Sequence, residues 1–136
     1  MTLRVMLVVP EGQVWSGNAD RVIAKTLDGD IGVLTGHTPV LGILTAGSIV
    51  RILPEGAGGS DWIQAAVGGG FLSVADDNVS ILAREASLGA DVNKSAIRSE
   101  LDSDGGVPGD GEDERAARAA RVAYLTAQLR AAGEEG

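Results

Sequence analysis

Few side chains in this 136-residue sequence have the chemistry that catalysis or metal binding requires. There is one histidine, His37, and there is no cysteine. The absence of cysteine excludes a thiol nucleophile, thiolate zinc sites and iron–sulfur clusters, and a single histidine excludes every metal site built from several. A Ser-His-Asp triad would depend on His37 alone, and no serine has the context of a nucleophile elbow. We therefore expect no catalytic residue, no metal site and no cofactor.

Two acidic clusters could in principle perform acid–base chemistry or bind a cation. Asp28 and Asp30 flank Gly29, and Asp76 and Asp77 precede Asn78. Neither cluster is followed by the further ligands of a calcium loop. Aspartate, asparagine and glycine are also the residues that form tight turns, so we interpret both clusters as turns.

The run of three glycines at residues 68–70 has the composition of a phosphate-binding loop. A P-loop, however, ends in Gly-Lys-Ser/Thr and leads into a helix, whereas the residues after Gly70 (FLSV) favour a strand. We therefore predict a bend between strands, where two backbones approach closely.

Arginines recur near the C-terminal end of the sequence in a pattern that favours one strip of a helix. Arg115, Arg118 and Arg121 follow each other at every third residue, and Arg130 lies further along. Two interpretations stay open: a solvated face balanced by the acidic residues before it, or a basic strip that docks on an acidic partner. The net charge of −8 and the aromatic content of 3% disfavour a nucleic-acid partner.

Short apolar runs separated by turn residues occupy the first two-thirds of the sequence. Runs of four to seven residues with turns at such spacing indicate antiparallel strands in a sandwich or barrel. In the first run, Leu3, Val5, Leu7 and Val9 share one face. We expect a β domain over residues 1–88. No apolar segment approaches the roughly 20 residues of a membrane span.

The pattern becomes helical after Gly89, and we expect a helical domain over residues 89–136. Asp91 is the expected N-cap of a short helix over residues 92–101, and an acidic, glycine-rich linker is expected at residues 102–111. Residues 115–132 favour a second helix, with one apolar stripe formed by Val122, Leu125, Leu129 and Ala132. A lone helix of about 18 residues is marginal in water, so this one needs a partner surface.

Four pieces of the sequence, in order, resemble the epsilon subunit of F-type ATP synthases. Residues 28–41 (DGDIGVLTGHTPVL) are similar to that family's acidic turn followed by Gly-His-x-Pro. The other three pieces are residues 14–17 (VWSG), 46–52 (AGSIVRI) and a hairpin formed by 69–74 (GGFLSV) and 79–83 (VSILA). The resemblance runs from about Leu3 to Asn93.

This resemblance implies a β-sandwich of about ten strands followed by a pair of helices. It implies a noncatalytic subunit of the central stalk that joins the gamma subunit to the c ring and turns with them. Proton flow through the ring would then drive ATP synthesis in the alpha–beta hexamer. The implied location is the cytoplasmic face of the bacterial cell membrane, with membrane contact only through the complex.

The resemblance also implies roles for particular residues. The turn of Asp28, Gly29 and Asp30 is the expected contact with the c ring, and Gly36, His37, Thr38 and Pro39 are the expected contact with gamma. A C-terminal tail that extends along gamma would inhibit ATP hydrolysis. The tail residues expected to meet acidic segments of the hexamer are Arg115, Arg118, Arg121 and Arg130.

The sequence departs from the family pattern at two points. Thr35 stands where the family usually has proline before Gly-His, which should loosen that turn locally. Some members bind ATP through Ile/Leu-Asp-x-x-Arg-Ala, but the corresponding residues 92–97 are VNKSAI. Asn93 and Ala96 replace the aspartate and the arginine, and Arg98 is displaced by roughly 200° around a helix. We therefore expect no nucleotide binding and no ATP sensing by this chain.

One interpretation from another class stays open, namely a small-molecule-binding or hydrolytic β-sandwich that uses His37 and nearby carboxylates. A stand-alone nucleotide-binding regulator is disfavoured by the altered motif.

Overall fold

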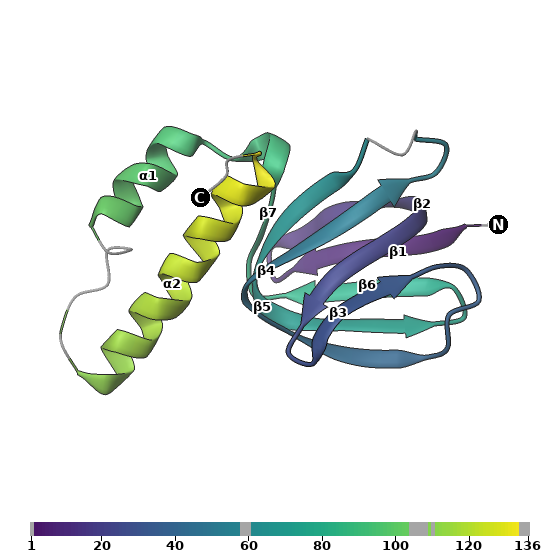
Figure 1. Cartoon of the computed structure of the whole chain (residues 1–136), viewed down its shortest axis with the longest axis horizontal. Coiled ribbons are helices and arrows are strands. Elements are labelled where there is room, and N and C mark those ends of the chain that lie inside the picture. The colour runs from purple at the N-terminus through teal and green to yellow at the C-terminus, as the bar shows by residue number, and fades with distance from the viewer. Residues whose placement is uncertain (1, 58–60, 104–108, 110, 134–136) are drawn as a thin grey trace.

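The computed structural model describes residues 2–57, 61–103, 109 and 111–133. Within them, the strands are β1 (Leu3–Val9), β2 (Gly12–Thr26), β3 (Gly29–Val33), β4 (Val40–Pro54), β5 (Ile63–Ala75), β6 (Asn78–Ala83) and β7 (Ala86–Leu88). A 3-10 helix, η1 (Gly89–Asp91), and two α-helices, α1 (Lys94–Asp102) and α2 (Glu112–Ala131), follow. The expected fold class, a β domain followed by a pair of helices, is confirmed (Figure 1).

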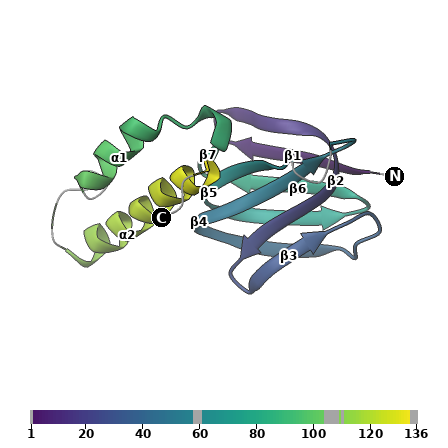
Figure 2. The ribbon, with the colours of Figure 1, turned by 45° about the horizontal axis from the view of Figure 1, so that its top comes forward.

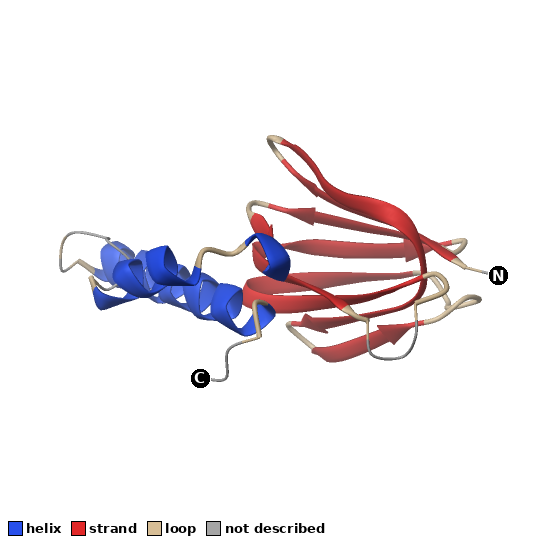
Figure 3. Cartoon of the chain, turned by 90° about the horizontal axis from the view of Figure 1, so that it is seen from above, coloured by secondary structure: helices blue, strands red, loops and turns tan. Residues whose placement is uncertain are grey.

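The strands form one sheet that closes on itself. The strand order is β1-β6-β5-β4-β2-β3, and β1 also pairs with β2, which completes the ring. The β1–β6 pairing is parallel, whereas β1 and β2 are antiparallel. Viewed from above, the helices lie at one end of this flattened barrel (Figure 3).

The expected number of about ten strands is wrong, because the described residues form seven. The long strands β2, β4 and β5 each continue through positions where the sequence suggests a break. Gly47 shifts the register of β4 against β5, and Gly69 has a φ of 104° inside β5. The backbone bends at these glycines and the pairing of β4 with β5 resumes on either side, so one bent strand replaces two straight ones.

The core of the β domain is aliphatic. Leu3, Val5 and Leu7 are fully buried on alternate positions of β1, as the sequence pattern predicts. The other large, fully buried side chains come from most of the remaining strands and include Val22, Val33, Val50, Ile52, Val67, Leu72 and Ile81.

Gly70 lies directly opposite Ala83 in the antiparallel pairing of β5 with β6, and its backbone needs the space that a side chain would fill. An added Cβ would lie 2.0 Å from the carbonyl oxygen of Leu82 and 2.7 Å from Cα of Ala83. The predicted close approach of two backbones at the glycine run is therefore confirmed, although the bend lies within one strand.

The first helix begins later than expected. Asp91 belongs to η1, and the N-cap of α1 is Asn93, whose side chain accepts a hydrogen bond from the backbone N–H of Ala96 at 3.1 Å. The prediction of Asp91 as N-cap is therefore wrong. Asparagine caps a helix as well as aspartate does, and Asn93 takes this role two residues later. Most of the expected linker, residues 104–108 and 110, lies outside the described residues.

The prediction of an apolar stripe on the second helix is also wrong, because only one of its four residues, Leu125, is buried. The residues of α2 that are buried are Tyr124, Leu125, Ala127, Gln128 and Ala131, whereas Val122 and Leu129 are half-buried. Alanine side chains do not stand out in a search for large apolar residues. They are buried here because small residues let the helix approach the sheet closely. Among the described residues, no helix is long and apolar enough to span a membrane.

Candidate interaction surfaces

The second helix docks on the β domain through small residues. Ala127, Ala131 and Tyr124 pack with Ala66 of β5, and Ile49 of β4 lies against this cluster. The approach is close enough that a Cβ on Gly47 would lie 3.0 Å from Cβ of Ala123. Figure 2 shows α1 and α2 side by side at this end of the sheet.

A short chain of polar side chains crosses the same interface. The hydroxyls of Ser87 and Tyr124 are 2.8 Å apart, and Nε2 of Gln128 donates to the Ser87 hydroxyl at 2.8 Å. Burial raises the pKa of the Tyr124 hydroxyl. The phenol is therefore neutral at physiological pH and remains able to donate, which fixes the rotation of α2 against β7.

Arg121 of α2 forms ion pairs with both the β domain and α1. Its guanidinium contacts Glu85 of the β domain at 3.1 Å and Glu100 of α1 at 2.9 Å. The hydrogen bond to Glu100 is the largest cause of a raised pKa for Arg121. One charged group on α2 therefore ties both the sheet and the first helix to it, and we call these three residues the Arg121 latch.

We expect Arg121→Gln to weaken the docking of the tail by about 1 kcal/mol, since two partly exposed ion pairs are lost. This change should increase the open fraction of the tail roughly fivefold. Hydrogen exchange of the α2 amides measures it, and Arg115→Gln, at an exposed position of the same helix, is the charge-matched control. High salt should remove most of the difference from wild type. Equal exchange in the two variants would contradict the latch.

The four arginines expected to act together do not share one surface. Arg115 is exposed, Arg118 donates to the carbonyl of Gly109, and Arg121 is held in the latch. Arg130 lies nine positions after Arg121, which places it on roughly the opposite side of the helix. There it lines a groove against the sheet.

The two turns expected to contact different partners lie at opposite ends of β3. The turn of Asp28, Gly29 and Asp30 joins β2 to β3, where the Thr26 hydroxyl donates to the carbonyl of Gly29 at 2.7 Å. Gly29 has a φ of 119°, a conformation that favours glycine. Residues 34–39 follow the other end of β3. The five residues of β3 place the two turns roughly 16 Å apart, so they do not form one site.

The turn that contains His37 is held in place by an aspartate from another turn. The Asp77 carboxylate accepts a hydrogen bond from the backbone N–H of Gly36 at 2.7 Å. Sequence patterns indicate only a turn at Asp77, because they do not show which segment lies across from it. The ring Nδ1 of His37 is 2.6 Å from the carbonyl oxygen of Thr38. Both side chains therefore contact backbone groups of the turn and help to hold its shape.

An apolar strip crosses the outer face of β4, β5, β6 and β1. The register pairs Ile43 with Phe71, Phe71 with Leu82, and Leu82 with Val8. Ile43, Phe71 and Leu82 are 58%, 45% and 43% exposed. Large apolar side chains at paired positions of neighbouring strands and open to solvent are typical of a protein-binding surface. We call these four residues the apolar strip.

The surface next to the apolar strip is hollowed and extends it. Pro10, Gly70 and Ala83 line a hollow of about 350 Å³ together with Val8, Phe71 and Leu82 of the strip. Leu41 and Met6 are also exposed, on the neighbouring row of the same strands. The sequence did not reveal this surface, because its members come from four strands that only the register brings together.

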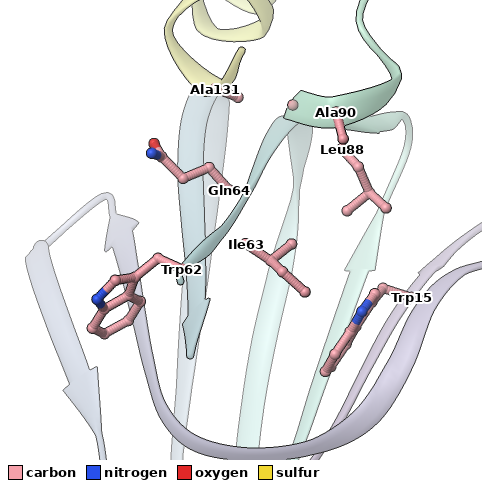
Figure 4. A pocket seen from close by; sticks show the side chains of 8 residues that line it. Trp15, Trp62, Ile63, Gln64, Leu88, Ala90 and Ala131 are labelled. Carbon is pink, nitrogen blue, oxygen red and sulfur yellow. The ribbon is translucent and has the colours of Figure 1, made fainter. Parts of the chain in front are cut away.

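The two tryptophans of the chain line a pocket of about 310 Å³ beneath the last turn of α2. Figure 4 shows Ile63 between Trp15 and Trp62, with Leu88, Ala90 and Ala131 above them. Because Ala131 belongs to the tail and the tryptophans to the β domain, tryptophan fluorescence should report on tail docking. Within the described parts of the chain, His, Cys, Asp and Glu form no group of three that could hold a metal ion.

Comparison with known proteins shows which family this chain is similar to. Residues 2–89 match the family described as "ATP synthase, Delta/Epsilon chain, beta-sandwich domain". An ATP synthase epsilon chain from Thermobifida fusca is 46% identical over 135 residues, which cover 98% of this chain and 93% of that relative. Another, from Frankia casuarinae, is 53% identical over 88 residues, which cover 65% of this chain and 99% of that relative.

Solved structures share the fold. A chain of the Euglena gracilis mitochondrial ATP synthase superposes with a TM-score of 0.77 at 21% identity, covering 98% of this chain and 82% of that one. A chain of the Tetrahymena thermophila mitochondrial ATP synthase gives a TM-score of 0.61 at 18% identity, covering 93% and 95%. The likeness therefore includes the helices as well as the β domain.

Proposed function

The chain belongs to the family of ATP synthase epsilon chains, and from that premise we propose that its β domain joins the gamma subunit to the c ring in the central stalk. In this role the chain turns with both partners and transmits torque while protons flow through the ring. It performs no chemistry of its own, and it lies at the cytoplasmic face of the cell membrane, held there by the complex.

The apolar strip is the observation that supports a contact with gamma. Its side chains are too exposed to serve the core, and together with the adjoining hollow they offer the concave apolar centre of a stable interface. We propose that gamma covers this strip and that residues 36–39 form the rim of the same contact. Binding of the full chain to purified gamma tests the proposal.

The turn of Asp28, Gly29 and Asp30 suits the contact with the c ring. It lies at the far end of β3 from residues 36–39, so one domain can hold two partners at once. Leu27, beside the turn, is 65% exposed and supplies an apolar contact next to the two carboxylates. We propose that this tip, Leu27 with the acidic turn, rests on polar loops of the ring.

We place the boundary between the two domains after Leu88, where β7 ends and η1 begins. The relative from Frankia casuarinae supports this boundary, because 88 matched residues account for 99% of its length. The coupling role therefore belongs to residues 1–88, and residues 89–136 act as a regulatory addition.

We expect that truncation after Asn93 raises ATP hydrolysis by the assembled enzyme about fivefold or more, which is the scale of a typical regulatory coupling. The reason is that the tail, once undocked, would reach acidic segments of the alpha–beta hexamer with its arginines. The measurement is ATP hydrolysis by complexes that contain full-length or truncated chain, with gamma binding as the control for assembly. Unchanged hydrolysis would reject inhibition and leave the coupling role alone.

A further inference from the structure

The hairpin that carries the acidic turn has little support of its own. β3 is the last strand in the order of the sheet, and among the described strands it pairs only with β2 (Figure 2). The register of the two strands ends at the pair of Thr26 and Gly29, and Leu27 and Asp28 form the loop between them. A two-stranded hairpin alone is marginally stable in water, so a tip at its end needs further contacts to hold one position.

The bent strand β4 supplies those contacts, although its ladder with β2 stops short of the tip. The backbone N–H of Leu27 donates to the carbonyl of Ile43 at 2.8 Å. The buried hydroxyl of Ser48 donates to the carbonyl of Lys25 at 3.0 Å. Residues 25–27 are therefore fixed to β4 at two points, one on either side of its bend at Gly47.

Thr26 joins the turn to the same strand through the two branches of its side chain. Its hydroxyl donates to the carbonyl of Gly29 at 2.7 Å and accepts from the backbone N–H of Asp28 at 3.2 Å. Its methyl group lies over Gly42 of β4, where an added Cβ would come within 2.9 Å of it. The hydroxyl therefore sets the shape of the turn, and the methyl group sets its distance from β4. We call these contacts the brace, and its residues are Thr26, Leu27, Gly42, Ile43 and Ser48.

The brace ends in the apolar strip. Ile43 is the β4 member of that strip, and its carbonyl is the one that accepts the hydrogen bond from Leu27 of the tip. The surface proposed for gamma and the tip proposed for the c ring are therefore joined by a direct backbone contact between neighbouring segments. A force applied at the tip reaches the strip without crossing a long loop.

We propose that the brace holds the tip in position for the c ring, with Thr26 as the positioning residue, and that it carries force between the tip and the apolar strip. The inference rests on the proposed function, because it takes the tip as the contact with the c ring. A turn that already has its bound shape binds more tightly than one that must first adopt it, since only the population with that shape is competent. A purely structural role for Thr26 would instead weaken the fold of the domain and both contacts together.

The test measures the affinity of the complex of chain and gamma for purified c ring in detergent. Thr26→Val keeps the methyl group but removes the hydroxyl, so we expect the affinity to fall about fivefold, the scale of one lost hydrogen bond. Thr26→Ser keeps the hydroxyl and should bind within about twofold of wild type. Thr2→Val is the matched control, because it makes the same change before β1, outside the brace. The affinity for gamma and the midpoint of thermal unfolding should change little in all three variants.

A second pair of variants tests the contact with Gly42 independently. Gly42→Ala places a methyl group within 2.9 Å of the Thr26 methyl and should push the tip away from β4, which weakens c-ring binding about fivefold. Adding Thr26→Ser to the same chain removes that close contact and leaves Cβ of residue 26 at 3.6 Å from the new methyl group. We expect this double variant to return to within about twofold of wild type, because the two positions are coupled through contact.

Equal c-ring affinity of Thr26→Val and wild type would overturn the inference. A matching loss of gamma affinity in Thr26→Val would overturn it as well, and so would a double variant as weak as Gly42→Ala. Leu27→Asp, a change in the tip itself, separates this inference from the proposed function. If Leu27→Asp weakens c-ring binding and Thr26→Val does not, the inference fails alone. If neither variant weakens it, the tip is not the contact, and the proposed function fails together with the inference.

Discussion

Replacing Gly70 with alanine is expected to lower the free energy of unfolding of the β domain by about 3–5 kcal/mol. The added methyl group would meet backbone atoms of Leu82 and Ala83, which belong to a paired strand and cannot rotate away. In addition, Gly70 has a φ of 149°, which an alanine adopts only with strain. Both effects destabilise the folded state and leave the unfolded chain almost unchanged.

Urea denaturation followed by circular dichroism measures this change. Gly32→Ala is the matched control, because Gly32 also lies in a strand but a Cβ there meets no atom within 4 Å. We expect the control to stay within about 1 kcal/mol of wild type. If Gly70→Ala were as stable as Gly32→Ala, the close approach of the β5 and β6 backbones at Gly70 would be wrong.

Placing a carboxylate in the apolar strip is expected to weaken gamma binding by about 2–4 kcal/mol, or roughly 30- to 1,000-fold. Ile43→Asp and Phe71→Asp each put a charge where an apolar partner surface would have to desolvate it. The two side chains are about half exposed and contribute little to the core, so both variants should fold. The affinity for purified gamma is the measurement, and thermal unfolding of each free variant verifies the fold.

Gly32→Asp serves as the control for the added charge. It introduces the same carboxylate at an exposed strand position on β3, which is not part of the apolar strip. We expect its affinity for gamma to remain within about threefold of wild type. Equal weakening by Gly32→Asp and Phe71→Asp would show that net charge, and not the apolar strip, governs binding.

The features that follow from local physics could be predicted from the sequence. Alternation in the first strand places Leu3, Val5 and Leu7 in the core, because side chains of a strand point to opposite faces in turn. The turn at Gly29 follows from a conformation that glycine favours. Periodicity alone limits the β domain to a sandwich or a barrel. The resemblance of residues 28–41 to the family signature then indicates which fold class is correct.

The features that depend on long-range register could not be predicted. Lys25, Arg51 and Arg130 are far apart in the sequence and meet only because the strand register and the docking of α2 bring them together. The same holds for the hydrogen bond from Gly36 to Asp77, which joins two turns 41 residues apart. The buried face of α2 was missed for another reason, since its alanines gain their partners, such as Ala66 and Ile49, only when the helix docks on the sheet.

The central claim is that the β domain is the part of the central stalk that holds gamma, and direct binding tests it. The measurement is a calorimetric titration of purified gamma subunit with the full chain, at physiological salt. We predict a one-to-one complex with a dissociation constant of about 1 μM or tighter, which corresponds to roughly −8 kcal/mol. The same complex should form with residues 1–93 alone. Absence of binding by the folded wild-type chain at tens of micromolar, on the order of ten times the predicted constant, would contradict the account.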